Sequence, residues 1–452
     1  MQSSFAKYLG IIGLLILTDF YIFPIGFQGI AAMNTKMLMA ACGVLYIFFN
    51  SKDLFNEFIN KQFICLSLWA CGFSLVCMIA VIWNGTSDYT YTSYIISMWV
   101  WLFAAFLFIN VIRNFHGYIT VPLLANYLTA VGVLQSISAL LLEYNTGFFN
   151  FVKSHQFGLT LLFDLEDRMQ GLSAALDPAG VRFALILVIL GYVAINYAKD
   201  NWPLLLTYLS SFIIITVVGN MIARTTTVGA VIAIAYWIGT LILGNGGQRK
   251  EAARIFASLG IALIAFLPFI IHYYRTDPHF QENIRFAFEG FFSLVESGKW
   301  EVSSNDILKS MIKFPETAKT WIIGDGYIEN PTNGRDPYYV GEHYHGYYMN
   351  TDIGYLRFIF YCGLTGLLTF AGFFIYAAKC MMERLPKDRM LALLILVLNF
   401  IIWMKVSTDI FQFFALFLCM PLQNYNEEET DGGTADVNTE TVREPNDYRL
   451  KA

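Results

Sequence analysis

Apolar stretches of about 20 residues recur along most of this chain, and that repetition constrains its fold more than any other feature. Only 14% of the 452 residues are charged, whereas a soluble protein usually carries about 25%. Backbone groups that lie in lipid must be hydrogen-bonded internally, and a helix achieves this within one segment. The sequence therefore predicts an all-α polytopic integral membrane protein.

Hydropathy predicts about twelve transmembrane helices. The predicted spans cover residues 8–27, 33–49, 63–83, 92–112, 118–142, 179–197, 203–222, 226–243, 255–271, 353–378, 390–404 and 409–421. The first is interpreted as an uncleaved span, because no convincing small-residue cleavage site follows it. Residues 1–421 thus form a membrane domain, and residues 422–452, with the run EEE, form an acidic tail that we expect to be disordered.

The distribution of lysine and arginine predicts the orientation, because cytoplasmic connections are enriched in both. Basic residues occur at positions 52 and 61, 113, 199, 249–254 and 379–389, in alternate connections. Assigning these to the cytoplasm places residues 83–91, 143–178 and 272–350 outside. With twelve spans, both termini are cytoplasmic.

Two of the outer segments are too long to be simple connections. Residues 143–178 could lie on the membrane surface. Residues 272–350 form a large loop in which ENIRFAFEGFFSLVESG has helical periodicity and Gly298 as its stop. A second helix is predicted at NDILKSMIKF, ended by Pro315, and the many aromatic residues argue against disorder in this loop.

No pattern in the chain favours a metal centre. The seven cysteines lie within or at the ends of apolar spans, without CxxC spacing. His343 and His345 are two residues apart, which is poor spacing for two ligands on one helical face. The acidic segment DLEDR, residues 164–168, is better explained as a solvated turn. We expect neither a metal nor another cofactor.

Three arginines lie at predicted outer ends of spans, where few cations are expected. Arg182 follows the helix-start signal Asp177-Pro178, Arg224 interrupts two apolar helices in NMIARTTTVG, and Arg357 follows Asp352 in NTDIGYLR. All three spans run inward, so their N-termini gather at the outer face. Helix N-termini and arginine both favour phosphate. The pattern predicts one outer-leaflet cavity that binds a pyrophosphate-like anion.

A simpler alternative is that each arginine reaches the lipid headgroups or pairs with an acid. This alternative is strongest for Arg182 and weaker for Arg357, which lies deeper in its span. It is weakest for Arg224, the only charged residue or histidine between Asp200 and Arg249.

The stretch EHYHGYYMNTDIGYLRF, residues 342–358, gathers groups that bind protons, sugars and anions at a membrane edge. His343, His345 and Asp352 are candidate bases. The candidate aromatic residues for packing against sugar rings are Tyr344, Tyr347, Tyr348, Tyr355 and Trp321. The alternatives are an interfacial aromatic belt, a hydrogen-bonded surface histidine, and an acidic residue that complements a helix dipole.

These features resemble a known family. The many spans, the helix pair broken by ARTTTVG, the large late outer loop and the segment MNTDIGYLRFIFYCGLTGLL are similar to the Wzy-type O-antigen and exopolysaccharide polymerases, which share a superfamily with the O-antigen ligases. The resemblance covers the whole topology, and its local motifs are moderately specific.

The resemblance implies a C-type membrane glycosyltransferase in the bacterial inner membrane, with its active site facing the periplasm. Its substrates would be undecaprenyl-pyrophosphate-linked oligosaccharides, with membrane lipids and a chain-length regulator protein as further partners and no nucleic acid. By position, Arg224 matches the arginine of the family's broken helix pair, and His343 or His345 matches the late loop histidine. Arg182, and Arg275 or Arg285 early in the loop, are weaker matches.

Two other functions remain open at this point. A ligase uses the same donor and transfers the glycan to lipid A core instead; the segment DIGYLRFIFYCG favours the polymerase branch. A flippase for the same lipid-linked glycan would predict paired repeats in the two halves and polar residues at mid-membrane. No repeat is obvious, and the first five spans carry no charges deep in the membrane.

Overall fold

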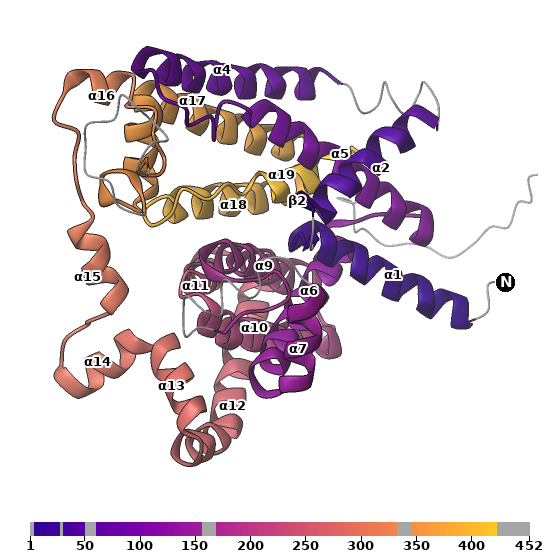
Figure 1. The fold of residues 1–452 in the computed structure, drawn as a ribbon. Helices are drawn as coiled ribbons and strands as arrows, with labels where there is room; N and C mark the ends of the chain where they lie inside the picture. Colours follow the sequence, from indigo (N-terminus) through magenta and orange to yellow (C-terminus); the bar gives the residue numbers. More distant parts are fainter. Residues whose placement is uncertain (1–3, 28–29, 50–59, 156–168, 332–345, 423–452) are drawn as a thin grey trace, which may run out of the picture.

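A computed structural model describes residues 4–27, 30–49, 60–155, 169–331 and 346–422, and these residues form mainly α-helices (Figure 1). In these ranges, nine helices are long and apolar enough to cross a membrane. The helices that carry these spans are α1 (Ser4–Ile22), α4 (Lys61–Asn84), α5 (Tyr94–His116), α6 (Val121–Tyr144), α9 (Leu176–Tyr197), α10 (Trp202–Ile222), α11 (Thr226–Leu243), α12 (Gly246–Thr276) and α17 (Gly354–Arg384).

Shorter elements complete the described chain. They are the strands β1 (Gly26–Phe27) and β2 (Ile30–Asn34), the helices α2 (Thr35–Phe49), α7 (Thr146–His155), α13 (Pro278–Ala287), α14 (Glu289–Ser297), α15 (Ser303–Ser310), α16 (Ala318–Ile322), α18 (Arg389–Ile402) and α19 (Phe411–Leu418), and the 3₁₀ turns η1 (Tyr348–Asn350) and η2 (Pro386–Asp388). The two strands pair antiparallel in a single small sheet.

Helix α9 is the centre of one half of the molecule. It packs against α6, α10, α11, α12 and α18, and nearly all of its length is buried. Its approach to α11 depends on Gly229, where a Cβ atom would lie only 2.2 Å from the Ala184 carbonyl oxygen. Because no larger residue fits there, α9 and α11 pack with their backbones in close contact, and the α10–α11 break is held beside the start of α9.

Helix α17 organises the other half. It lies beside α4 and also packs against α16, α18 and α19 (Figure 1). It is interrupted at Gly363, whose φ of 66° lies in the left-handed region. The segment after α16 fills the interruption, because the amides of Asp325 and Gly326 donate to the carbonyls of Phe360 and Tyr361. These hydrogen bonds attach the large loop to α17 at the point where the helix is interrupted.

The prediction of an all-α membrane protein is confirmed for helix content and apolar length, and nine of the roughly twelve predicted spans are matched by helices long and apolar enough to cross a membrane in the described ranges. The predicted spans 33–49, 390–404 and 409–421 correspond to α2, α18 and α19, which have 15, 14 and 8 residues. Each is shorter than the roughly 20 residues that a full crossing needs. The tail from residue 423 lies outside the described residues.

The large loop contains more helices than predicted. ENIRFAFEGFFSLVESG forms two helices, α13 and α14, separated at Phe288, where Arg224 takes the nearby carbonyl of Phe286 as its acceptor. Gly298 ends α14 in the left-handed conformation, as predicted. Helix α15 ends at Ser310, before the predicted stop at Pro315.

The predicted cap of α9 is wrong, and the acidic residue at the start of α17 is paired with a cation. Helix α9 begins at Leu176, so Asp177 lies in its first turn, and its carboxylate accepts hydrogen bonds from Thr225 and Lys405. Helix α17 begins at Gly354 after Ile353, and the carboxylate of Asp352 binds Arg357 instead of capping the helix. In both cases a side-chain cation competes successfully for the carboxylate.

Candidate functional site

Two cavities share a wall formed by Arg224 and Phe286. The smaller cavity has a volume of about 550 Å³ and lies among the starts of three helices. Leu176, Asp177 and Pro178 come from the first turn of α9, Arg224 precedes α11, and Asp352 precedes α17. The structure thus brings together the three segments that carry the singled-out arginines.

Two cations, Arg224 and Lys405, line the smaller cavity, and a third, Arg357, contacts its lining residues Asp352 and Tyr347. Each of the three has a carboxylate partner. Arg224 pairs with Glu289 at 2.7 Å. Lys405 pairs with Asp177 at 2.9 Å and also donates to the Thr225 hydroxyl at 3.0 Å.

Arg357 pairs with Asp352 at 3.1 Å, and its guanidinium carbon lies 4.2 Å from the centre of the Tyr347 ring. Its Nε is buried without a hydrogen-bond partner among the described residues. Burial raises the pKa of Asp352 to about 6, despite the opposing effect of Arg357. Asp352 therefore contributes to the wall of the smaller cavity, and Arg357 is buried next to it without being one of the lining residues.

Arg224 is the most constrained of these cations. Its Nε donates to the carbonyl of Phe286 at 3.1 Å, and its guanidinium carbon lies 4.1 Å from the centre of that residue's ring. A terminal nitrogen binds Glu289 and also approaches the Ser303 hydroxyl at 3.4 Å. The side chain keeps 17% exposure. Arg224 therefore joins the α10–α11 break to α13, α14 and α15.

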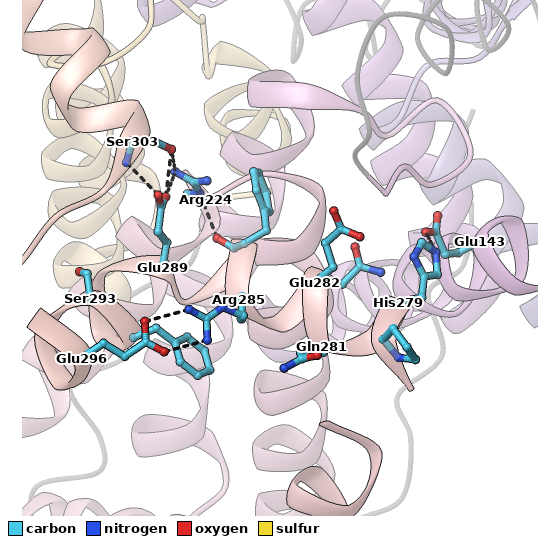
Figure 2. A pocket seen from close by; sticks show the side chains of 14 residues that line it. Glu143, Arg224, His279, Gln281, Glu282, Arg285, Glu289, Ser293, Glu296 and Ser303 are labelled. Carbon is cyan, nitrogen blue, oxygen red and sulfur yellow. Dashed lines mark hydrogen bonds and ion pairs between the residues drawn. The ribbon is translucent and has the colours of Figure 1, made fainter. Parts of the chain in front are cut away.

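The larger cavity, of about 1080 Å³, lies against α13 and α14 and reaches Glu143 at the end of α6 (Figure 2). In Figure 2, Arg285 and Glu296 face each other across one side, at 2.8 Å in two parallel hydrogen bonds. At the opposite side, His279 Nε2 lies 2.5 Å from Glu143 Oε1. The lining is polar and carries both signs of charge.

The remaining singled-out residues lie elsewhere. Arg182 is on α9, with its guanidinium carbon 5.6 Å from the centre of the Phe23 ring, and Arg275 is exposed in the last turn of α12. Tyr355 donates to the Phe400 carbonyl at 2.8 Å. These three residues are not among those that line the two cavities.

The singled-out aromatic residues of the loop are also spread apart. Trp321 donates to the Pro315 carbonyl at 2.9 Å, and Tyr348 donates to Asp325 at 3.3 Å. Of the aromatic candidates that the structure describes, Tyr347 lines the smaller cavity. His343, Tyr344 and His345 lie outside the described residues.

No protein-family model matches this chain. No curated protein or solved structure matches it either.

Sequence reasoning missed three parts of this site. Lys405 follows the predicted span 390–404 at its outer end, so the rule that singled out the arginines could also have found it. The His279–Glu143 pair joins residues from two distant segments. Glu289 lies 65 positions after Arg224 in sequence, and no local signal connects the two.

Proposed function

We propose that this chain is a membrane glycosyltransferase that moves a growing glycan from undecaprenyl pyrophosphate onto a new lipid-linked repeat unit. The observation that carries the proposal is the smaller cavity, where three helix starts meet and Arg224 and Lys405 form part of the lining, with Arg357 paired to the lining residue Asp352. Helix N-termini and guanidinium groups are suited to phosphate. The resemblance to Wzy-type polymerases supports the same reaction.

In the proposed reaction, an acceptor hydroxyl oxygen forms a bond to the anomeric carbon of the donor sugar. The bond between that carbon and the pyrophosphate oxygen breaks, and undecaprenyl pyrophosphate leaves. Negative charge grows on the leaving oxygen, so fixed cations stabilise the transition state more than the ground state. This role is assigned to Arg224, Lys405 and Arg357.

The existing ion pairs determine which groups a pyrophosphate would have to compete with. Glu289, Asp177 and Asp352 already hold the three cations in place, so the ligand must share or displace these carboxylates. The carboxylates orient the cations before the substrate arrives, which lowers the entropy lost on binding.

The proton of the acceptor hydroxyl needs a base. Asp352, with its raised pKa, can accept a proton near neutral pH. His343 and His345 remain candidates from the sequence, and His279, which Glu143 orients, adds a candidate from the structure.

The proposal places the chain in the bacterial cytoplasmic membrane with the site facing the periplasm. The support is the excess of lysine and arginine in the connections at the opposite ends of the spans.

The deciding experiment uses purified protein in lipid nanodiscs with lipid-linked repeat units as the only glycan. A ladder of polymer on a gel is the expected result. Transfer that occurs only after lipid A core is added would identify a ligase and contradict the polymerase proposal. Movement of the lipid-linked glycan across vesicles, without any new glycosidic bond, would identify a flippase.

A further inference from the structure

The larger cavity differs in charge from the smaller one. Its lining contains four glutamates but only two arginines. Both arginines are already paired, Arg224 with Glu289 and Arg285 with Glu296. Glu143 pairs with His279, which leaves Glu282 as the carboxylate without a cation partner among the lining residues. An acidic ligand would meet Glu282 without a free guanidinium to offset it. The charge of this cavity therefore disfavours anions.

Asn283 gives independent evidence that the cavity takes a polar ligand. This residue lines the cavity with only 9% of its surface exposed. Its Nδ2 lies near the Tyr144 hydroxyl and makes no hydrogen bond of normal geometry within the described chain. A buried donor that is not hydrogen-bonded costs folding free energy. A ligand oxygen at this wall would remove that cost.

The other groups on the wall suit a ligand rich in hydroxyl groups. Glu143 and Glu282 accept hydrogen bonds, Gln281 both donates and accepts, and the rings of Phe286 and Phe292 offer apolar faces. Saccharides present hydroxyl donors and acceptors around a ring with apolar C–H faces. The volume of about 1080 Å³ is at the upper end of the range for ligand pockets.

We infer that the larger cavity binds the saccharide of the lipid-linked substrate, and that this saccharide is neutral or amino-bearing rather than acidic. The inference rests on the proposed function, because the shared wall of Arg224 and Phe286 would place the sugar beside a pyrophosphate in the smaller cavity. The inference adds a substrate class, namely repeat units in which the sugars that enter this cavity are not uronic acids.

The test measures binding without catalysis. The probe is the glycan that mild acid releases from the lipid-linked repeat units of cells expressing this chain. A matched acidic probe is the same glycan after its primary hydroxyls have been oxidised to carboxylates. With the protein in nanodiscs, the native glycan should bind and the oxidised form should bind at least about tenfold more weakly. Equal or tighter binding of the oxidised form, a native glycan that is itself acidic, or no binding of either would overturn the inference.

Two substitutions locate the binding to this cavity. Asn283→Leu should weaken binding of the native glycan about tenfold. Its thermal midpoint should stay equal or rise, because Nδ2 makes no hydrogen bond that the change would remove. Glu282→Gln should narrow the preference for the native over the oxidised glycan. Glu316→Gln, an exposed residue outside the cavity, is the matched control.

The two proposals can fail separately. Polymer formation together with unchanged glycan binding in Asn283→Leu and Glu282→Gln would remove the saccharide assignment and leave the polymerase. Glycan binding that responds to these variants, without polymer in the nanodisc assay, would leave the saccharide site and remove the polymerase.

Discussion

The two cavities that meet at Arg224 use similar charged groups in different surroundings. The smaller cavity holds its ion pairs at the starts of α9, α11 and α17, where Arg357 and Asp352 have exposures of only 11% and 18%. In the larger cavity, Arg285 and Glu296 keep 42% and 52% exposure. Solvent screens exposed charges, so Arg224, at 17% exposure, interacts more strongly with a bound anion than Arg285 does.

The difference shows that the role of an arginine depends on its hydrogen-bond partners and its exposure. Arg285 forms two hydrogen bonds with one carboxylate, which uses both of its terminal nitrogens. Arg224 divides its hydrogen bonds among a carbonyl, a carboxylate and a hydroxyl, and it faces both cavities. Each of the following predictions tests this distinction.

The largest effect is expected at Arg224. Arg224→Ala should reduce chain extension about 100-fold or more, because it removes a donor from the developing charge on the leaving group. The measurement is the rate of polymer formation in nanodiscs.

A matched change separates this role from tethering of the loop. Glu289→Gln loosens the same contact to α14 but keeps the Arg224 cation. If Arg224 only holds the loop, both variants should lose activity to the same extent. If it binds pyrophosphate, Glu289→Gln should retain most of the activity.

The rate of chain extension should depend on pH through Asp352. Its pKa of about 6 means that its basic form predominates above pH 6 and is lost as the pH falls through that value. If Asp352 is the base, chain extension should fall about tenfold between pH 7 and pH 5. The rate profile of Asp352→Asn should be low and flat in this interval. A wild-type profile that persists in Asp352→Asn would assign the base elsewhere.

Lys405 should have a smaller effect, because Asp177 already offsets part of its charge. Lys405→Met is expected to slow chain extension about fivefold, and Lys405→Arg should restore most of it. The double variant Lys405→Met with Asp177→Asn shows whether the loss comes from the missing cation or from an uncompensated carboxylate. Lys387→Met, at an exposed position outside the lining of both cavities, is the control.

Arg285 should have the smallest effect. Arg285→Gln is expected to change chain extension by less than about twofold, because Glu296 already neutralises this exposed arginine. A loss as large as that of Arg224→Ala would show that both cavities bind the pyrophosphate, and the distinction between them would fail. The same nanodisc assay measures it.

Two Asp-Pro pairs show what could be predicted from sequence. At Asp277-Pro278, the carboxylate accepts hydrogen bonds from the amides of His279 and Phe280 and caps α13, as the local pattern indicates. At Asp177-Pro178, the same pair lies inside the first turn of α9, because Lys405 recruits the carboxylate from 228 positions away. Local signals predict helices, but a distant partner can redirect a side chain.

The rest of the site shows the same contrast between local signals and distant partners. Helices α9, α10 and α11 lie within a few residues of their predicted spans, and Arg224 lies at the predicted break, because apolar length and capping residues are local features. Arg224 binds the carboxylate of Glu289 and the carbonyl of Phe286, and both of these partners belong to the large loop. No local rule relates that loop to the helix break, so the shared wall of the cavities could not have been predicted.

The interruption of α17 has a consequence for how the protein is assembled. In lipid, the carbonyls of Phe360 and Tyr361 would lack donors, and each unpaired group there costs several kcal/mol. The amides that pair with them belong to Asp325 and Gly326, in the loop that precedes α17. That loop is synthesised first, so it must reach its position at the membrane before α17 can complete its own hydrogen bonding. Insertion of this helix is therefore coupled to the arrival of the loop during biogenesis.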